Sequence, residues 1–284
     1  MLNSPVRLVF LTCAVGALTA CGGGSVNSTP GPIVSPPPPP PPPVAQAPFG
    51  VVADTEFVTE GDVVSLKWIA AQNAYALTMP GHTSDILEFG GTPNGSELHY
   101  GRNGLSLMLR TDLDYSYTNY AVIVEGGWGY PVGELAFGLP TAEGDVPVSG
   151  SASYEAEVHG GDGQINGEWD FQPHNYTVGG NANLTFDFGE GTLSGHFDPT
   201  LYNYSGEEWS LGRYTFVNTV FGVGNTAFSG DLQHVDFTDL GSFEGSFTGP
   251  QAAELLSRWQ VPYLNPWSNE QGSLHGIWIG RKRD

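Results

Sequence analysis

Residues 241–250 read Gly-Ser-Phe-Glu-Gly-Ser-Phe-Thr-Gly-Pro, and this stretch decides the fold that we expect. Apolar or small residues alternate with polar ones, which is typical of a strand with one buried face. Phe243 and Phe247 share that face and point into the interior. Glycine is unfavourable in a strand unless a close approach requires it, so Gly245 indicates a crowded, tightly curved wall. The stretch therefore predicts one strand of a small barrel.

Similar alternation extends on both sides of this stretch. Strands are expected at residues 150–159, 164–171, 180–188, 192–197, 209–218, 225–233, 241–247 and 273–280. Eight antiparallel strands joined by short turns can close into an up-and-down barrel that is filled by side chains. Residues 250–259 interrupt the alternation, because Pro250 suits a first helical turn and good helix formers follow it. We expect a capping helix there.

Residues 49–147 form a second region with less regular alternation. Strands are expected at residues 62–69, 74–79, 105–110 and 117–124. The strands are shorter and the loops longer than in the rest of the chain, so we interpret this region as a β-rich handle subdomain and not as a barrel. The predicted fold class is all-β, with the handle at 49–147 and the eight-stranded antiparallel barrel at 148–284.

The charge of the chain excludes one class of partner. The 30 Asp and Glu residues outnumber the 9 Lys and Arg residues, giving a formal net charge of −21. Nucleic acid is not expected as a partner because its phosphates would be repelled. The cysteines, Cys13 and Cys21, both precede residue 22, so the folded part has neither a disulfide framework nor a cysteine metal site.

The amino terminus predicts a lipid anchor. Residues 1–20 hold a short apolar run, too short to span a bilayer, and end in Leu18-Thr19-Ala20 before Cys21, as in bacterial lipoprotein signal peptides. We expect Cys21 to be acylated, for example with palmitate, and to hold the protein in the outer membrane. A plain signal peptide with a chance cysteine is the alternative. Residues 21–48 are rich in proline and predict an extended tether.

Three motifs in the second half resemble one known family. They are the stretch 241–250 followed by Ala252-Ala253-Glu254, the hairpin at residues 182–195, and the strand start at residues 148–154. Together they resemble the barrel of transferrin-binding-protein-like surface lipoproteins. The resemblance implies a single handle-plus-barrel lobe, displayed on the cell surface, that binds an extracellular protein or an iron- or haem-carrying ligand. An outer-membrane receptor is a further partner that it implies.

Enzyme signatures are poor, and no enzymatic activity is expected. Residues 222–227 match the letters of a dinucleotide-binding loop, but a strand pattern follows where that loop needs a helix. The seven histidines lack the spacing of a metal site, so neither a metal nor a cofactor is expected. Haem ligation by one or two loop histidines remains the alternative.

Two aromatic stretches are the candidate ligand-binding surface. Residues 201–209 and 261–267 lie outside the regular alternation and combine aromatic rings with Pro, Asn and Gly. The candidate residues are Tyr202, Tyr204, Trp209, Tyr263 and Trp267. Tyr and Trp dominate protein–protein hot spots, but these rings could instead fold back over the barrel mouth. The alternative function is a structural or periplasm-facing envelope lipoprotein without a soluble ligand.

Overall fold

The computed structural model describes residues 47–80, 85–91, 97–126, 130–165, 168–169, 176–203 and 206–283. The signal peptide 1–20, Cys21 and nearly all of the tether 21–48 lie outside these residues, and so do Tyr204, His82 and His174. All described residues belong to one compact unit, Pro43–Asp284. Among them, no helix is both long enough and apolar enough to cross a membrane.

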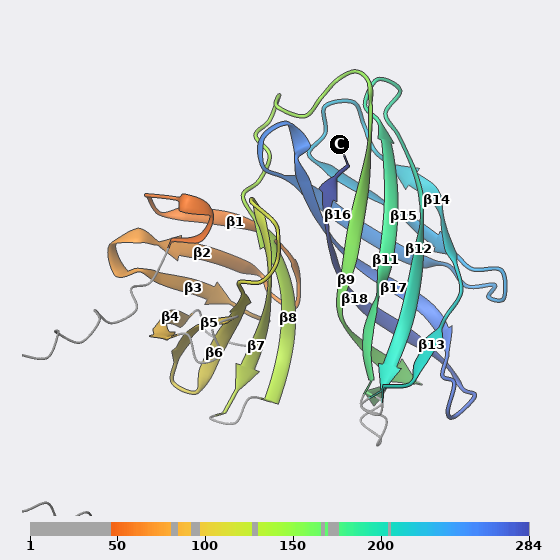
Figure 1. The fold of residues 1–284 in the computed structure, drawn as a ribbon, viewed down its shortest axis with the longest axis horizontal. Helices are drawn as coiled ribbons and strands as arrows, with labels where there is room; N and C mark the ends of the chain where they lie inside the picture. The colour runs from red at the N-terminus through yellow and green to blue at the C-terminus, as the bar shows by residue number, and fades with distance from the viewer. Residues whose placement is uncertain are drawn as a thin grey trace, which may run out of the picture. The chain divides into compact units, whose positions relative to one another are not determined.

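The first eight strands close into an antiparallel barrel in chain order (Figure 1). They are β1 (Thr55–Gly61), β2 (Ser65–Ile69), β3 (Ala74–Thr78), β4 (Asp85–Gly91), β5 (Glu97–Arg102), β6 (Leu105–Arg110), β7 (Thr118–Glu125) and β8 (Tyr130–Gly138). The expectation that residues 49–147 do not form a barrel is therefore wrong. β1 pairs with β2 through residues 55–57 and with β8 through residues 58–61, so one short strand serves two neighbours.

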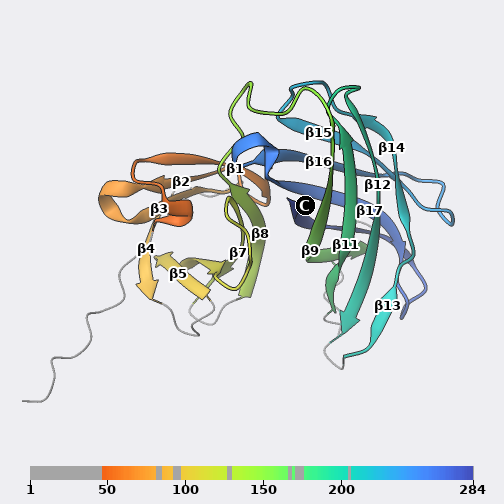
Figure 2. The same cartoon turned by 45° about the horizontal axis from the view of Figure 1, so that its top comes forward.

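The remaining strands build a second antiparallel barrel (Figure 2). They are β9 (Ser151–Ile165), β10 (Glu168–Trp169), β11 (Tyr176–Asp187), β12 (Thr192–Asn203), β13 (Glu208–Ser210), β14 (Tyr214–Val220), β15 (Ala227–Gln233), β16 (Gly241–Thr248), β17 (Glu254–Leu264) and β18 (Gln271–Lys282). β9 pairs with β18 and closes the barrel, while β10 and β13 are short additions to β9 and β12. The predicted eight-stranded barrel is confirmed.

The expectation of a capping helix over residues 250–259 is wrong. Only Pro250–Ala252 form a short 3-10 helix, η3, and β17 follows at Glu254. Leu255 and Leu256 are both buried, because one packs into the second barrel and the other faces the first. A strand that is covered on both faces shows no alternation at that point, and pairing with β16 and β18 overrides its helix propensity. The strand expected at residues 164–171 is also divided where the structure describes it, since β9 continues to Ile165 and residues 168–169 form β10, which pairs back onto β9.

The crowding expected at Gly245 is present, although its cause is a strand and not a helix. Gly245 is buried between Phe243 and Phe247 on the inner face of β16. A Cβ atom there would lie 2.4 Å from the carbonyl oxygen of Leu256 on β17 and 2.7 Å from the ring of Phe228. The glycine therefore allows the close approach of a neighbouring strand and an aromatic ring.

Candidate functional site

One candidate surface lies where the chain leaves one end of the second barrel. It consists of residues 201–203, 206–213, 234–240 and 263–271, which we call the loop end. The register of β15 with β16 and of β17 with β18 places the last two of these segments at the same end of the sheet. β13 adds a third segment because Leu201 and Tyr202 of β12 pair with Trp209 and Glu208. The loop end thus gathers all of the predicted aromatic residues that the structure describes.

Trp209 and Trp267 are brought together at the loop end. Their ring centroids are 4.5 Å apart in a T-shaped arrangement, and both rings are half-buried against the core of the second barrel. Asn265 is buried and holds the turn that carries Trp267, because its Oδ1 accepts hydrogen bonds from the backbone N–H groups of Trp267 (2.9 Å) and Ser268 (3.1 Å). The two tryptophans therefore form a rigid base, with part of their surface open to solvent.

The other two described candidates lie in strands. Tyr202 of β12 is half-buried, and its ring lies over Gly179, where a Cβ atom would be 2.8 Å from Tyr202 Cε2. Tyr263 of β17 is fully buried in the barrel core. The expectation that these two residues lie outside the regular alternation is therefore wrong, because Tyr202 belongs to β12 and the alternation of β17 continues through Tyr263. Ligand binding by any of the five candidate residues stays a prediction.

The exposed aliphatic side chains of the loop end were not identified from the sequence as candidate binding residues. Val235 is 91% exposed, and Leu240 and Leu264 are each 45% exposed. Five carboxylates accompany them at the loop end: Glu207, Glu208, Asp236, Asp239 and Glu270. The guanidinium of Arg213 already binds both carboxylate oxygens of Asp198, at 2.8 and 2.9 Å. The exposed surface of the loop end is thus apolar and negatively charged. The sequence could not indicate its aliphatic residues, because they differ from core residues of the same type only in that no other element covers them.

A second candidate site is the joint between the barrels, which consists of two facing rows of side chains. Cross-strand pairing aligns Glu60, Ala136 and Tyr120 across β1, β8 and β7. It likewise aligns Arg258, Ile277 and His159 across β17, β18 and β9. Residues paired in this way share one face of a sheet. The centre of the joint is an apolar cluster of Tyr120, Ala136, Leu256, Ile277 and Ile279.

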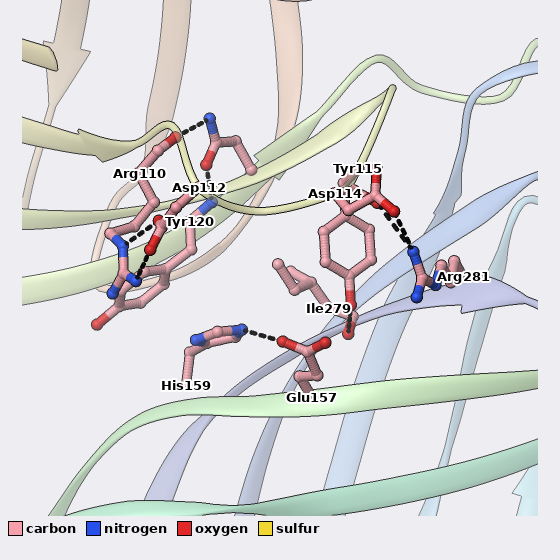
Figure 3. A network of polar contacts seen from close by, with 10 residues as sticks. Arg110, Asp112, Asp114, Tyr115, Tyr120, Glu157, His159, Ile279 and Arg281 are labelled. Carbon is pink, nitrogen blue, oxygen red and sulfur yellow. Dashed lines mark hydrogen bonds and ion pairs between the residues drawn. The ribbon is translucent and has the colours of Figure 1, made fainter. Parts of the chain in front are cut away.

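Polar contacts hold the joint at its margins (Figure 3). The carboxylate of Glu254 accepts hydrogen bonds from the backbone N–H groups of Ser116 (2.7 Å) and Tyr117 (2.9 Å). The hydroxyl of Tyr115 donates to the carbonyl oxygen of Ile279 at 3.0 Å. These contacts join residues more than a hundred positions apart, so no local sequence pattern could have indicated them.

Burial shifts the titration of one group at each end of the facing rows. It raises the pKa of Glu60 to about 7, and the neighbouring Arg258 only partly opposes this effect. Burial also lowers the pKa of His159 to about 4, with a further lowering by Arg110. Clefts of about 460 and 470 Å³ adjoin the Glu60 end of the rows.

Metal binding has no visible centre in the part of the chain that the structure describes. There, no three or more His, Cys, Asp or Glu side chains are grouped so that they could hold a metal ion. His234 is buried and packs against Tyr214 and Phe237, with ring centroids at 4.7 and 5.3 Å. Haem ligation by a loop histidine stays an untested alternative.

Comparison with known protein families finds a match for the second barrel. Residues 146–282 match the family model that describes the C-lobe and N-lobe β-barrels of transferrin-binding protein B. The resemblance of its glycine and phenylalanine motifs to these barrels is thereby confirmed over residues 146–282. No curated protein sequence matches the chain.

Solved structures of the same kind are similar to the chain at low identity. A transferrin-binding protein B variant from Haemophilus parasuis Hp5 is 14% identical with a TM-score of 0.47, over 81% of this chain and 45% of that one. Transferrin-binding protein B from serogroup B Neisseria meningitidis is 15% identical with a TM-score of 0.45, over 81% and 44%. The N-lobe domain of lactoferrin-binding protein B from Moraxella bovis is 16% identical with a TM-score of 0.36, over 64% and 81%. The chain thus matches less than half the length of these two transferrin-binding proteins, and the likeness concerns the fold alone.

Proposed function

We propose that this chain is a lipid-anchored protein of the outer-membrane surface that binds an extracellular protein through the loop end of its second barrel. The observation that carries the proposal is the match of residues 146–282 to the barrels of transferrin-binding protein B. The named relatives bind transferrin or lactoferrin, so an iron-carrying protein is the first class of ligand to test.

The composition of the loop end supports a protein ligand. Exposed Val235, Leu240 and Leu264 would lose unfavourable contact with water on binding, and the half-buried Trp209 and Trp267 supply rigid aromatic area. The carboxylates around them favour a ligand with a basic surface and speed its approach. Such a surface suits a large partner better than a small molecule, which binds in an enclosed cavity.

The amino-terminal sequence supports the anchor. Leu18-Thr19-Ala20-Cys21 has the lipoprotein pattern, and the proline-rich tether would hold the barrels away from the membrane. Cys21→Ala should abolish lipidation, and incorporation of labelled palmitate by this variant would contradict the anchor. Protease treatment of intact cells tests the surface location, since a periplasm-facing protein would be spared.

Binding is tested with the immobilised chain and with transferrin, lactoferrin and haemoglobin as probes. Val235→Asp places a charge at the most exposed of the three aliphatic side chains of the loop end. Val52→Asp is its matched control, because Val52 is 95% exposed and precedes the first barrel. We expect Val235→Asp to weaken the binding of the captured probe at least tenfold and Val52→Asp to leave it unchanged. Equal effects of the two substitutions would exclude the loop end as the binding surface.

A further inference from the structure

The two facing rows of the joint carry a titratable side chain at each end, Glu60 at one end and His159 at the other. Ala136, Tyr120 and Ile277 lie between these two side chains. The side chains of Glu60 and His159 are both only 15% exposed. A charge is costly at such positions unless a partner of opposite charge or hydrogen bonds compensate for its lost hydration.

Glu60 has weak compensation for a negative charge. Its Oε2 lies 3.6 Å from Nε of Arg258, which is too long for a hydrogen bond, and the same guanidinium also binds the carboxylate of Glu244. The titratable and charged groups in the two adjoining clefts are Asp62, Glu134, Glu244, Arg258 and His275. Three of these five are carboxylates and one is an arginine, so an ionised Glu60 would add to a local excess of negative charge.

His159 has weak compensation for a positive charge. Its Nε2 is buried without a hydrogen-bond partner, and the nearest carboxylate oxygen, Oε2 of Glu157, is 3.7 Å away (Figure 3). Its ring stacks on Tyr120, with centroids 5.0 Å apart and planes at 25°. From the first barrel, Arg110 and Asp112 also act on His159 with opposite signs, and these two bind each other through two hydrogen bonds of 2.7 and 2.6 Å.

We propose that the joint between the barrels is proton-sensitive and closes fully only while Glu60 and His159 are both uncharged. Glu60 must hold its proton and His159 must lack one, so opposite protonation states are required at the two ends of the same pair of rows. Ionisation of either residue would favour an open joint, in which water enters between the two rows, while each barrel keeps its own hydrogen-bonded wall.

The directions of the two pKa shifts define the pH range in which each residue favours the closed joint. The pKa of Glu60 is raised from 4.5 to about 7, so its contribution is fully present below pH 4.5 and is lost as the pH rises to 7. The pKa of His159 is lowered from 6.5 to about 4, so its contribution is fully present above pH 6.5 and is lost as the pH falls to 4. Between these limits the two effects oppose each other, and the closed joint is favoured in mildly acidic solution.

Amide hydrogen exchange of the full chain between pH 4.5 and 6.5 tests this proposal. The amides of Ser116 and Tyr117, both bonded to Glu254, report on the joint, and the amide of Phe247, bonded to Thr226, reports on the second barrel. Exchange is expressed as the opening constant, after correction for the intrinsic rate. In the wild type, we expect the opening constant of the joint to be nearly independent of pH in this window.

Single substitutions should give opposite slopes. In Glu60→Gln only His159 responds, so the opening constant should fall up to tenfold per pH unit as the pH rises. His159→Phe keeps a ring against Tyr120 and leaves only Glu60 to respond. In this variant the opening constant should rise by the same factor as the pH rises. The double variant should again be flat, and Glu56→Gln, an exposed residue of the same strand, should behave as the wild type.

Each outcome decides the matter. The proposal would be supported if the two single variants gave opposite pH slopes at the amides of Ser116 and Tyr117 and no slope at the amide of Phe247. Unchanged slopes in Glu60→Gln, or equal slopes at Phe247, would overturn it, because the joint would then either ignore the proton or open only with the whole protein. If His159→Phe fails to fold, the pH slopes of Glu60→Gln and Glu56→Gln can still be compared, and equal slopes in these two variants would overturn the proposal.

Discussion

The two barrels of this chain close by different means. Strands of the first barrel have five to nine residues, and β1 divides its length between two partners. The eight strands that close the second barrel have seven to fifteen residues and pair along longer stretches. The burial pattern of β1 shows no regular alternation, although the still shorter β2 and β6 alternate strictly. The comparison teaches that a closed barrel does not require a regular sequence pattern.

The barrels also differ in what fills their cores. Phe186 lies at the centre of an aromatic cluster in the second barrel, with five other rings at centroid distances of 4.8–6.1 Å. In the first barrel, residues that precede β1 complete the core, because Phe49 packs against Phe57 and Phe137 at 5.8 and 5.7 Å. Both cores therefore include residues from outside the strands, because Phe188 and Phe221 follow β11 and β14 in the second barrel and Phe49 precedes β1 in the first.

The largest effect is expected from removing an aromatic ring at the centre of a core. Phe186→Ala should lower the free energy of unfolding of the second barrel by about 3–5 kcal/mol, because a cavity remains where the ring was. Phe137→Ala is the matched change in the first barrel. Hydrogen exchange in denaturant, followed separately in the two barrels, measures whether each substitution acts on one barrel or on both. Equal effects on both barrels from either substitution would show that they unfold as one unit.

A smaller effect is expected from breaking the joint itself. Glu254→Ala leaves the backbone N–H groups of Ser116 and Tyr117 without their acceptor, and we expect a loss of about 2–4 kcal/mol. Glu254→Gln keeps one carbonyl oxygen and should lose less. Chemical unfolding measures both. If Glu254→Ala has no effect, the barrels do not stabilise each other through this contact.

The next effect concerns the tight wall of the second barrel. Gly245→Val should lower the free energy of unfolding by about 1–3 kcal/mol, because the added Cβ would meet the backbone of Leu256 and the ring of Phe228. Ser242→Val on the exposed face of the same strand is the control. An unchanged denaturant midpoint for Gly245→Val would contradict the crowding.

The smallest effect is expected where the tether enters the first barrel. Phe49→Ala removes a half-buried ring and should cost about 1 kcal/mol, less than a fully buried ring. Its effect should be confined to exchange in the first barrel. A comparable loss of protection in the second barrel would mean that the two cores are not separate.

Much of the second barrel could be predicted from the sequence. Phe243, Gly245 and Phe247 specify an inner face and a close approach, and both features follow from the alternation of neighbouring residues along one strand. β17 could not be predicted in this way. Leu255 and Leu256 face two different cores, so the alternation disappears at the point where the first barrel covers the second.

The sequence by itself determined that the chain is all-β and that its second half is a barrel, because a strand with one buried face repeats every two residues whatever its neighbours are. Only the tertiary structure decided that the first region is also closed and that a joint links the two barrels. Arg258 contacts Glu60, and His159 stacks on Tyr120, only because the registers of six strands align them. Register is set by pairing between distant segments, so the positions that are buried and shifted in pKa at the joint have no local signature.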